Sequence, residues 1–340
     1  MTFSRSFPTG LHNLASRAST EMASNRPGTV KSAVRALIET RLGGNLRFWA
    51  SWRDATRENK FVREIANKLS ASILKPTELR SQIRKPHADT LFILGSGASV
   101  EDLDPENFRE INSQVSVGIN AWPLHHFVPD FYAFEPVPED DSDHYRTMSL
   151  LARPDILAKQ PHVLFLKPRT QIEVDQFFQI PVKLRSRTLL YGRFQPSTRA
   201  LRNLSSDLGR LIGKLEATNF PVVPDSGASI VRMAALGILM GFKRIVFVGV
   251  DLNNTHYFWE RNPAHLARNG IEGFSSGQTR DTHETMERIK RPFIVTEMIQ
   301  ALATPGKARG TEILVASKNS ELATIVGVYR FEERAVQPKI

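Results

Sequence analysis

From Asp89 onward the sequence alternates short apolar runs with segments of helical periodicity, and this alternation constrains the fold more than any other feature. Several of the apolar runs show no polar alternation, as expected for strands that are covered on both faces. The runs predicted to be strands are Leu91–Leu94, Val115–Ile119, Phe131–Phe134, His162–Leu166, Leu189–Tyr191, Ile245–Val250 and Ile313–Ala316. Strands that alternate with helices predict an α/β fold: a Rossmann-like, mainly parallel sheet with helices on both faces.

The composition is that of an ordinary globular chain, with 340 residues, 41% hydrophobic and 24% charged. Cysteine is absent, which excludes disulfides, thiolate metal sites and a cysteine nucleophile. No apolar run reaches membrane-spanning length, and the first residues lack the apolar core of a secretory signal. The expected location is therefore the cytoplasm, with the inner face of the membrane as a possible peripheral site.

Positive charge is concentrated near the N-terminus. Residues 1–90 contain sixteen Lys or Arg and seven Asp or Glu, whereas the other 250 residues carry a net charge of +1. Residues 1–27 are polar and predicted to be disordered, and residues 28–85 to form a basic helical extension whose first helix ends at Gly43–Gly44. Such an extension suits an anionic membrane surface, or equally an appendage packed on the main domain at residues 86–335.

The clearest local unit is Pro224–Asn254, "PDSGASIVRMAALGILMGFKRIVFVGVDLNN". Asp225 or Ser226 can cap a helix there, Gly241 can close it, and a strand follows that ends at Asp251. In an open α/β sheet, ligands bind beyond the carboxyl ends of the strands. The sequence places small or polar residues after three predicted strands, at Gly95–Ser99, Asn120 and Asp251, and so predicts one shared crevice.

Each of these residues also has an ordinary structural interpretation. The turn Gly95-Ser-Gly-Ala-Ser99 can bring backbone N–H groups to a phosphate, or it can be a plain tight turn. Asn120 can contact a base or ribose, or cap a turn. Ser226 and Gly227 can hold an anion at a helix N-terminus, or serve as an N-cap. Tyr257 can donate to a leaving phosphate, and His256 can transfer a proton.

Two further groups of side chains are predicted to lie outside the site. The acidic stretch Glu139–Asp143 contains two aspartates of a kind that can hold a divalent metal, but a solvated acidic loop is the favoured interpretation. The pair His125–His126 is expected to be a surface or fold-related feature, because adjacent residues face different ways. No metal site is predicted.

Taken in order, these segments resemble the bacterial sialyltransferases of glycosyltransferase family 42, which cap lipooligosaccharide with sialic acid. The first turn of that family, Asn-Gly-Pro-Ser, is similar to Ser96–Ser99, and its next strand ends in Asn, as here at Asn120. Its strongest block is similar to Ser226–Asp251, "SGASIVRMAALGILMGFKRIVFVGVD". A late Pro-Asn-Ser is echoed by Asn319 and Ser320. The resemblance covers residues 90–330, and it is weak between Arg153 and Val222.

The resemblance implies an inverting transfer of sialic acid, or a related nonulosonic acid, from a CMP-sugar to a glycan or glycolipid. It implies a small lid, placed around residues 153–222, and no obligatory cofactor, with magnesium at most stimulatory. The residues implied to hold the nucleotide are Gly95, Ser96, Gly97, Ser99, Asn120, Ser226, Gly227, Asp251, Asn253, Asn319 and Ser320. The catalytic residues implied are Tyr257 and His283, with His256 in reserve.

Two departures from the family and two other function classes stay open. Asn253 stands where the family has a second tyrosine, and no histidine matches the family's base at the same spacing, His283 being the nearest. A pterin pyrophosphokinase-like enzyme shares a Gly-x-Gly-x-Ser turn and a strand ending in Gly-x-Asp, and would need magnesium. A non-catalytic nucleotide- or nucleic-acid-binding protein fits the basic N-terminal segment, although no nucleic-acid motif is present and no nucleic-acid partner is expected.

Overall fold

The structure is a computed structural model that describes residues 41–83, 85–137, 141–253, 256–274, 284–286 and 292–332. The chain divides into two compact units, Met1–Trp49 and Ala50–Ile340. The second unit contains a ten-stranded sheet in which all paired strands are parallel. The predicted Rossmann-like α/β fold is thereby confirmed. Within the described residues, no helix is both long and apolar enough to span a membrane.

The strands follow the order β1-β6-β5-β4-β3-β2-β8-β9-β10, and β7 pairs with β6. Their bounds are β1 (Ser72–Ile73), β2 (Thr90–Leu94), β3 (Val115–Ile119), β4 (Phe131–Phe134), β5 (His162–Leu166), β6 (Thr188–Phe194), β7 (Val222–Pro224), β8 (Arg244–Val248), β9 (Glu312–Val315) and β10 (Gly327–Val328). The seven predicted strands are all present. The sequence missed β1, β7 and β10, which are only two or three residues long.

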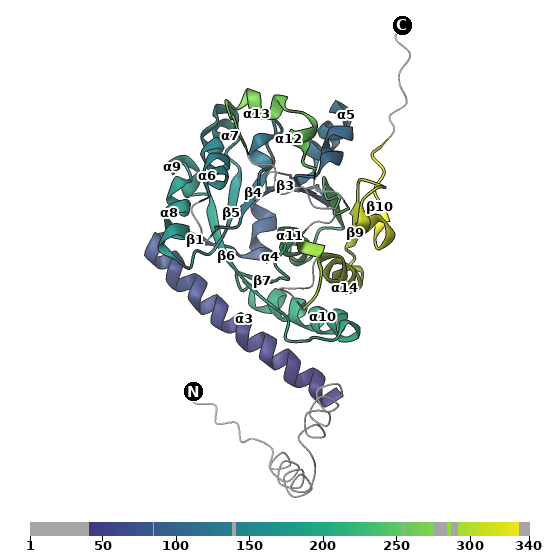
Figure 1. Cartoon of the computed structure of the whole chain (residues 1–340). Helices are drawn as coiled ribbons and strands as arrows, with labels where there is room; N and C mark the ends of the chain where they lie inside the picture. Colours follow the sequence, from purple (N-terminus) through teal and green to yellow (C-terminus); the bar gives the residue numbers. More distant parts are fainter. Residues whose placement is uncertain are drawn as a thin grey trace, which may run out of the picture. The chain divides into compact units, whose positions relative to one another are not determined.

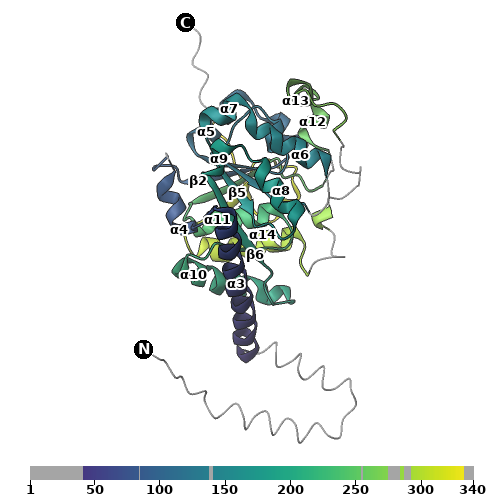
Figure 2. The ribbon, with the colours of Figure 1, turned by 90° about the vertical axis from the view of Figure 1, so that its left-hand side faces the viewer.

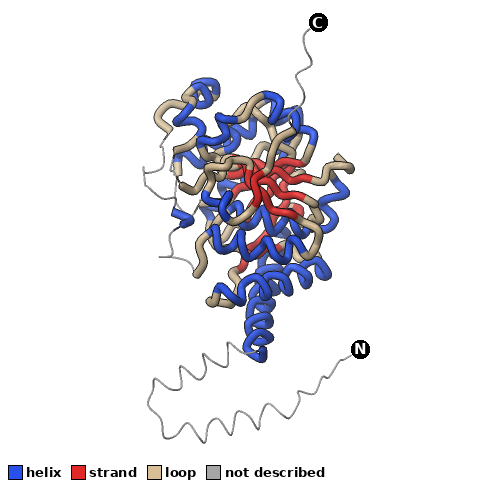
Figure 3. The backbone as a smooth tube through the Cα atoms, turned by 90° about the vertical axis from the view of Figure 1, so that its right-hand side faces the viewer, coloured by secondary structure: helices blue, strands red, loops and turns tan. Residues whose placement is uncertain are grey.

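Helices cover both faces of the sheet, as Figures 1 and 2 show, and the strands lie between them in Figure 3. The longer helices of one face are α10 (Leu201–Thr218), α11 (Ser229–Leu239) and α14 (Val295–Lys307). On the other face lie α5 (Pro105–Ser113), α6 (Ser142–Ser149), α7 (Pro154–Lys159), α8 (Gln171–Gln179) and α9 (Val182–Arg185). The remaining helices are α3 (Arg41–Leu69), α4 (Pro76–Leu79), α12 (Phe258–Arg261) and α13 (Ala264–Arg268).

Alternate side chains of β2 enter the two halves of the core. Phe92 and Leu94 join the apolar cluster under α5–α9, whereas Leu91 faces Leu236 and Met240 at α11 and its end. Since every residue of β2 is buried, its last four residues form an unbroken apolar run. The same two-sided burial explains why the central strands were predictable from their sequence.

Two predicted boundaries differ from the structure. Helix α3 runs through Gly43–Gly44, where the sequence predicted an end. Each glycine costs about 1 kcal/mol relative to alanine in a helix, a cost that a 29-residue helix can absorb. Residues 153–222, where a lid was expected, contribute β5 and β6 to the central sheet.

The predicted extension at residues 28–85 is divided between the two units. Its later part belongs with the sheet, because β1 pairs with β6 and Val62 is fully buried in the core. The buried ammonium group of Lys167, just beyond β5, lies 3.3 Å from the carboxylate of Glu58 on α3. The compact unit that carries the sheet therefore begins at Ala50 and not at residue 86.

Three histidines, His125, His126 and His265, have ring nitrogens within 4.8 Å of one another. The rings are stacked, with the His125 centroid 4.3 Å from His126 and 4.9 Å from His265. Nδ1 of His125 accepts the N–H of Phe127 at 3.0 Å, and Nε2 of His265 lies 2.8 Å from Glu101 Oε1. Stacked rings do not converge their in-plane lone pairs on one point, so these contacts favour an aromatic cluster over a metal site. The sequence argument had the two neighbours facing apart, whereas their rings are in contact.

The buried histidines make stability depend on pH. Burial lowers the pKa of His125 to about 2, and the positive charges of His126, His265 and two arginines add to this effect. The unfolded chain takes up a proton near pH 6.5, whereas the folded chain does not, so stability is full above that pH and falls as the pH drops. At pH 5 this one group costs about 2 kcal/mol of unfolding free energy.

We therefore predict that denaturant unfolding at pH 8, 6.5 and 5 will show a steep loss of stability on the acid side. His125→Asn keeps an acceptor for the Phe127 N–H but removes the titrating ring, and should flatten the dependence. The exposed His87 provides the control, His87→Asn, which should leave the slope unchanged. An unchanged slope in His125→Asn would contradict this account.

Candidate functional site

The candidate site lies where the strand order reverses. The chain leaves β2 toward β3 on one side, and returns to β8 on the other side of β2 before it continues to β9. In sheets of this kind the crevice beyond the carboxyl ends of these strands is the usual ligand site. A cavity of about 480 Å³ opens there, lined by the turns that follow β2 and β8, by Asn120, by the start of α11, and by α6 and α12.

The turn after β2 is pressed against the turn after β8. The N–H of Gly97 donates to the carbonyl of Gly249 at 2.8 Å. A Cβ on Gly97 would lie 2.5 Å from Asp251 Oδ2, and one on Gly249 would lie 2.4 Å from Val100 Cγ2. Gly249 also has φ +64°, a conformation that side chains disfavour. The small residues of the first turn are therefore explained by the approach of another backbone.

Asp251 joins the two turns by hydrogen bonds. Its Oδ2 accepts the backbone N–H of Ser99 at 3.0 Å, and its Oδ1 accepts the Ser99 hydroxyl. The carboxylate is buried, at 6% exposure, so these bonds compensate for its desolvation. Ser99 does not line the cavity, and its two donors are directed at Asp251.

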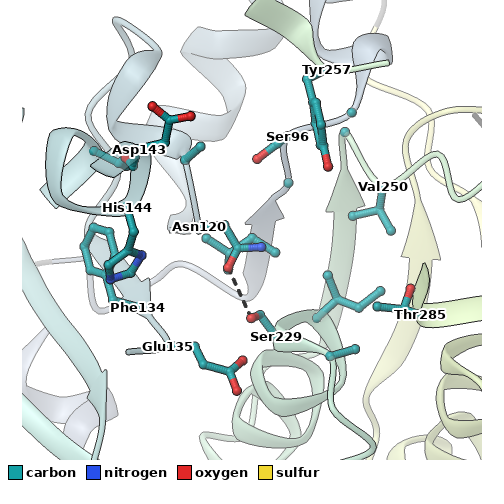
Figure 4. A pocket seen from close by; sticks show the side chains of 18 of the residues that line it. Ser96, Asn120, Phe134, Glu135, Asp143, His144, Ser229, Val250, Tyr257 and Thr285 are labelled. Atoms are coloured by element: carbon teal, nitrogen blue, oxygen red, sulfur yellow. Dashed lines mark hydrogen bonds between the residues drawn. The ribbon is translucent and has the colours of Figure 1, made fainter. Parts of the chain in front are cut away.

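Tyr257 is held over the same turn. It forms an isolated antiparallel bridge with Gly97, and the N–H of Phe258 donates to the carbonyl of Ser96 at 3.0 Å. Its ring stacks on Trp259 at 4.5 Å, with 10° between the planes. Figure 4 shows the Tyr257 hydroxyl directed into the cavity beside Ser96. The hydroxyl oxygen of Ser96 is buried and has no hydrogen-bond partner among the described residues.

A chain of polar contacts fixes the amide of Asn120. Nη2 of Arg232 donates to the Ser229 hydroxyl at 2.8 Å, and that hydroxyl donates to Asn120 Oδ1 at 3.3 Å (Figure 4). Asn120 itself has φ +53°, a left-handed conformation that asparagine tolerates better than most residues. With its oxygen engaged by Ser229, the Asn120 amide is left with its NH₂ group to offer to a ligand.

The floor of the cavity rests on a buried ionic network. Arg232 is fully buried and pairs with Glu135 and with Asp225, whose Oδ1 lies 3.1 Å away. Arg193 also pairs with Glu135 and lies 3.3 Å from Asp225. Burial disfavours the charged form of Arg232, but the electrostatic effects of Tyr191, Asp225 and Glu135 outweigh it, so the pKa of Arg232 lies above its ordinary value. Removing one partner would leave an uncompensated buried charge, a change that is strongly destabilising.

Helix α6 supplies the wall that contains Asp141, Asp143 and His144. Asp141 caps the helix by accepting the N–H groups of Asp143 at 2.9 Å and His144 at 3.2 Å. The sequence placed both aspartates in a solvated loop; in the structure they line the cavity. Burial lowers the pKa of His144, opposed by the nearby Asp141. The imidazole is therefore uncharged at neutral pH.

No known protein family and no curated protein matches the sequence.

Among solved structures, the chain is similar to the sialyltransferase CST-II in complex with a trisaccharide acceptor and CMP, at 16% identity and a TM-score of 0.37, covering 70% of this chain and 85% of that one. It is also similar to the monofunctional alpha-2,3-sialyltransferase Cst-I from Campylobacter jejuni, at 15% identity and a TM-score of 0.39, covering 72% of this chain and 82% of that one. A third similar structure is the MAf glycosyltransferase from Magnetospirillum magneticum AMB-1, at 15% identity and a TM-score of 0.37, covering 74% of this chain and 33% of that one. These TM-scores are low, so the similarities establish no function for this chain.

The structure brings together eight of the residues that the sequence assigned to the site. They are Gly95, Ser96, Gly97, Asn120, Gly227, Asp251, His256 and Tyr257. Five others do not line the cavity: Ser99, Ser226, Asn253, Asn319 and Ser320. Ser320 instead donates to the carbonyl of Val250, and Asn253 donates to the carbonyl of Asn319. His283 lies outside the described residues.

Sequence reasoning missed several residues of the cavity, among them Glu135, His144, Ser229, Trp259 and Thr285. Glu135 directly follows β4, so the strand-end rule that selected Asn120 would also have selected it. Helix α11 begins at Ser229 and not at Ser226, because Asp225 first accepts the N–H groups of Gly227 and Ala228 in a turn. The side chain at the start of the helix is therefore Ser229.

The contact between the two turns can be tested with a single methyl group. Gly97→Ala places a Cβ against Asp251 and should lower the unfolding free energy by on the order of 1–3 kcal/mol, because the backbone on both sides is fixed. The matched control is Gly209→Ala in α10, where the new Cβ would lie 3.4 Å from Pro305, an ordinary contact. That change should be neutral or stabilise by up to about 1 kcal/mol. Equal stability of the two variants in denaturant titrations would show that the turns are not closely packed.

Proposed function

We propose that this chain is a CMP-sugar-dependent, inverting glycosyltransferase. Its donor would be CMP-sialic acid or the CMP derivative of a related nonulosonic acid, and its acceptor a glycan or glycolipid. The observation that carries the proposal is the convergence of Ser96, Asn120 and Tyr257 on one cavity at the strand-order reversal. These three side chains occupy positions of the family resemblance, in three segments far apart in the sequence.

In this proposal the chain's residues act on the leaving nucleotide. Ser96 offers a buried hydroxyl without a partner among the described residues, and Asn120 offers its NH₂ group. The Tyr257 hydroxyl donates to the phosphate as the bond to the sugar breaks, which stabilises the developing charge without a metal. CMP suits such a donor, because a ketose with an anomeric carboxylate leaves a single phosphate.

The carboxylates of the cavity are relevant to the alternative function, a magnesium-dependent enzyme that uses a nucleoside triphosphate, because such an enzyme needs acidic ligands for the metal. Four of them line it: Glu135, Asp141, Asp143 and Asp251. Each is engaged by the protein, since two arginines pair with Glu135, Arg146 lies 3.3 Å from Asp143, Ser99 binds Asp251, and Asp141 caps α6. Carboxylates already engaged by the protein in this way are less available as ligands for a metal ion.

The nucleotide preference decides between the two. Calorimetric titration of the protein with CMP, UMP and ATP, each with and without magnesium, should show binding of CMP that is tightest and independent of the metal. Ser96→Ala should weaken CMP binding by roughly tenfold, the loss of one hydrogen bond to a charged group. Ser113→Ala is the matched control, since Ser113 is exposed at the end of α5 and does not line the cavity. Tighter binding of ATP with magnesium than of CMP would replace this proposal with the kinase-like one.

Peripheral binding to an anionic membrane belongs to the same proposal. Residues 1–49 contain seven basic and two acidic residues, and the compact unit that follows starts at Ala50. Each basic residue near an anionic surface contributes about 1 kcal/mol, so this segment can bring the enzyme to lipid-linked acceptors.

A chain that starts at Ala50 should therefore sediment with phosphatidylserine vesicles much less than the full chain does, at low and at moderate salt. Vesicles of phosphatidylcholine alone serve as the control, and neither protein should bind them. Equal sedimentation of both proteins with the anionic vesicles would contradict the proposed role of residues 1–49 in membrane binding.

A further inference from the structure

His144 is a half-buried side chain of α6 with one ring nitrogen that is fully buried. Its Nε2 atom is buried, and it has no hydrogen-bond partner among the described residues. A buried polar atom left in this way costs on the order of 1–3 kcal/mol, and native structures contain few of them. His144 lines the cavity of the candidate site, so a role toward a ligand is the first explanation to consider.

The surroundings of His144 hold the ring in place but give its Nε2 atom no partner among the described residues. Its backbone N–H is fixed by Asp141, the N-cap of α6, at 3.2 Å. The imidazole meets the ring of Phe134 edge-on, with 6.5 Å between centroids and 88° between planes. One turn further on, Thr147 donates its hydroxyl to the carbonyl of Asp143 at 2.9 Å and not to the imidazole.

The charged groups near the ring come from three elements. Helix α6 contributes Asp141 and Asp143, and the end of β4 contributes Glu135. On α8, which packs against α6, Glu173 turns back to cap its own helix by accepting the N–H of Thr170. Burial lowers the pKa of the ring, and this effect outweighs that of Asp141, which raises it.

We propose that His144 is the general base of the transfer reaction, an assignment that rests on the proposed glycosyltransferase function. In the step, an acceptor oxygen forms a bond to the anomeric carbon while the bond from that carbon to the CMP phosphate breaks. The phosphate leaves with the electron pair of that bond, and the hydroxyl proton moves to the imidazole and from there to solvent.

The arrangement of the cavity fits the stereochemistry of inversion. In a displacement with inversion, the attacking oxygen and the leaving phosphate lie on opposite sides of the reacting carbon. Figure 4 shows His144 on one side of the cavity and Tyr257, with Ser96, on the other. The base on α6 therefore faces the attacking oxygen, and the hydroxyls of Ser96 and Tyr257, which donate hydrogen bonds to the phosphate, face the leaving group.

The other described histidine of the cavity is less suited to the role. The side chain of His256 is 66% exposed, and its Nδ1 lies 3.7 Å from Glu260. It directly precedes Tyr257 and so stands on the side of the leaving group. His144, which is more sheltered and stands opposite the leaving group, is better placed to accept the proton of the attacking hydroxyl.

The test uses the full chain and CMP-N-acetylneuraminic acid, with release of CMP to water as the assay. For the unaltered protein, kcat/KM should rise with pH through a pKa below 6.5 and then stay level. His144→Gln should lower kcat by about 100- to 10,000-fold and abolish the acid limb, with CMP affinity within about threefold of the parent. His144→Ala should regain part of its rate when imidazole is added. Tyr257→Phe should lower the rate but keep the acid limb, and the exposed His87→Gln should change neither.

A His144→Gln protein that keeps its rate and its acid limb would overturn the assignment. Proton NMR titration of the His144 ring, identified by the signal that His144→Gln lacks, gives a second readout that needs no turnover. A pKa below 6.5 supports the base role, and a pKa at or above 6.5 overturns it. A protein that binds CMP but releases none from the donor contradicts the proposed function, and in that case the titration alone decides on His144.

Discussion

The close approach of two turns, one after β2 and one after β8, is the constraint on which the site depends. Gly97 and Gly249 let the backbones meet, and the carboxylate of Asp251 ties them through both donors of Ser99. Tyr257 then bridges to Gly97 across the joined turns. A larger residue at either glycine would separate β2 from β8 at the point where the strand order reverses. The cavity lies at that point, so its shape would change as well.

The buried ionic network around Arg232 also positions residues of the cavity. Arg232 lies on α11 with no exposure to solvent, and it connects Glu135, Asp225 and Ser229. Through Ser229 this buried cation sets the orientation of the Asn120 amide. The polar groups that face the cavity are thus positioned by groups behind them, as expected of a preorganised site.

The sequence predicted the central strands well, because strands buried on both faces carry apolar runs such as Leu91–Leu94. It could not find β1 or β7, which owe their pairing to β6 and have no pattern of their own. It located the first turn of the site but assigned Ser99 to the ligand, since nothing local reveals that Asp251, 152 positions away, takes both of its donors. His144 sits in a stretch whose acidic composition indicates a solvated loop, and only packing against Phe134 shows that it enters the cavity.

A structure of the full chain with CMP bound tests the central claim most directly. The account predicts that the nucleotide occupies the cavity at the strand-order reversal. Its phosphate should lie within hydrogen-bond distance of the Ser96 and Tyr257 hydroxyls, and the Asn120 NH₂ group should donate a hydrogen bond to the nucleotide. The contact between Ser99 and Asp251 should remain unchanged. CMP bound away from this cavity, or bound in it without contact to any of these three side chains, would contradict the account.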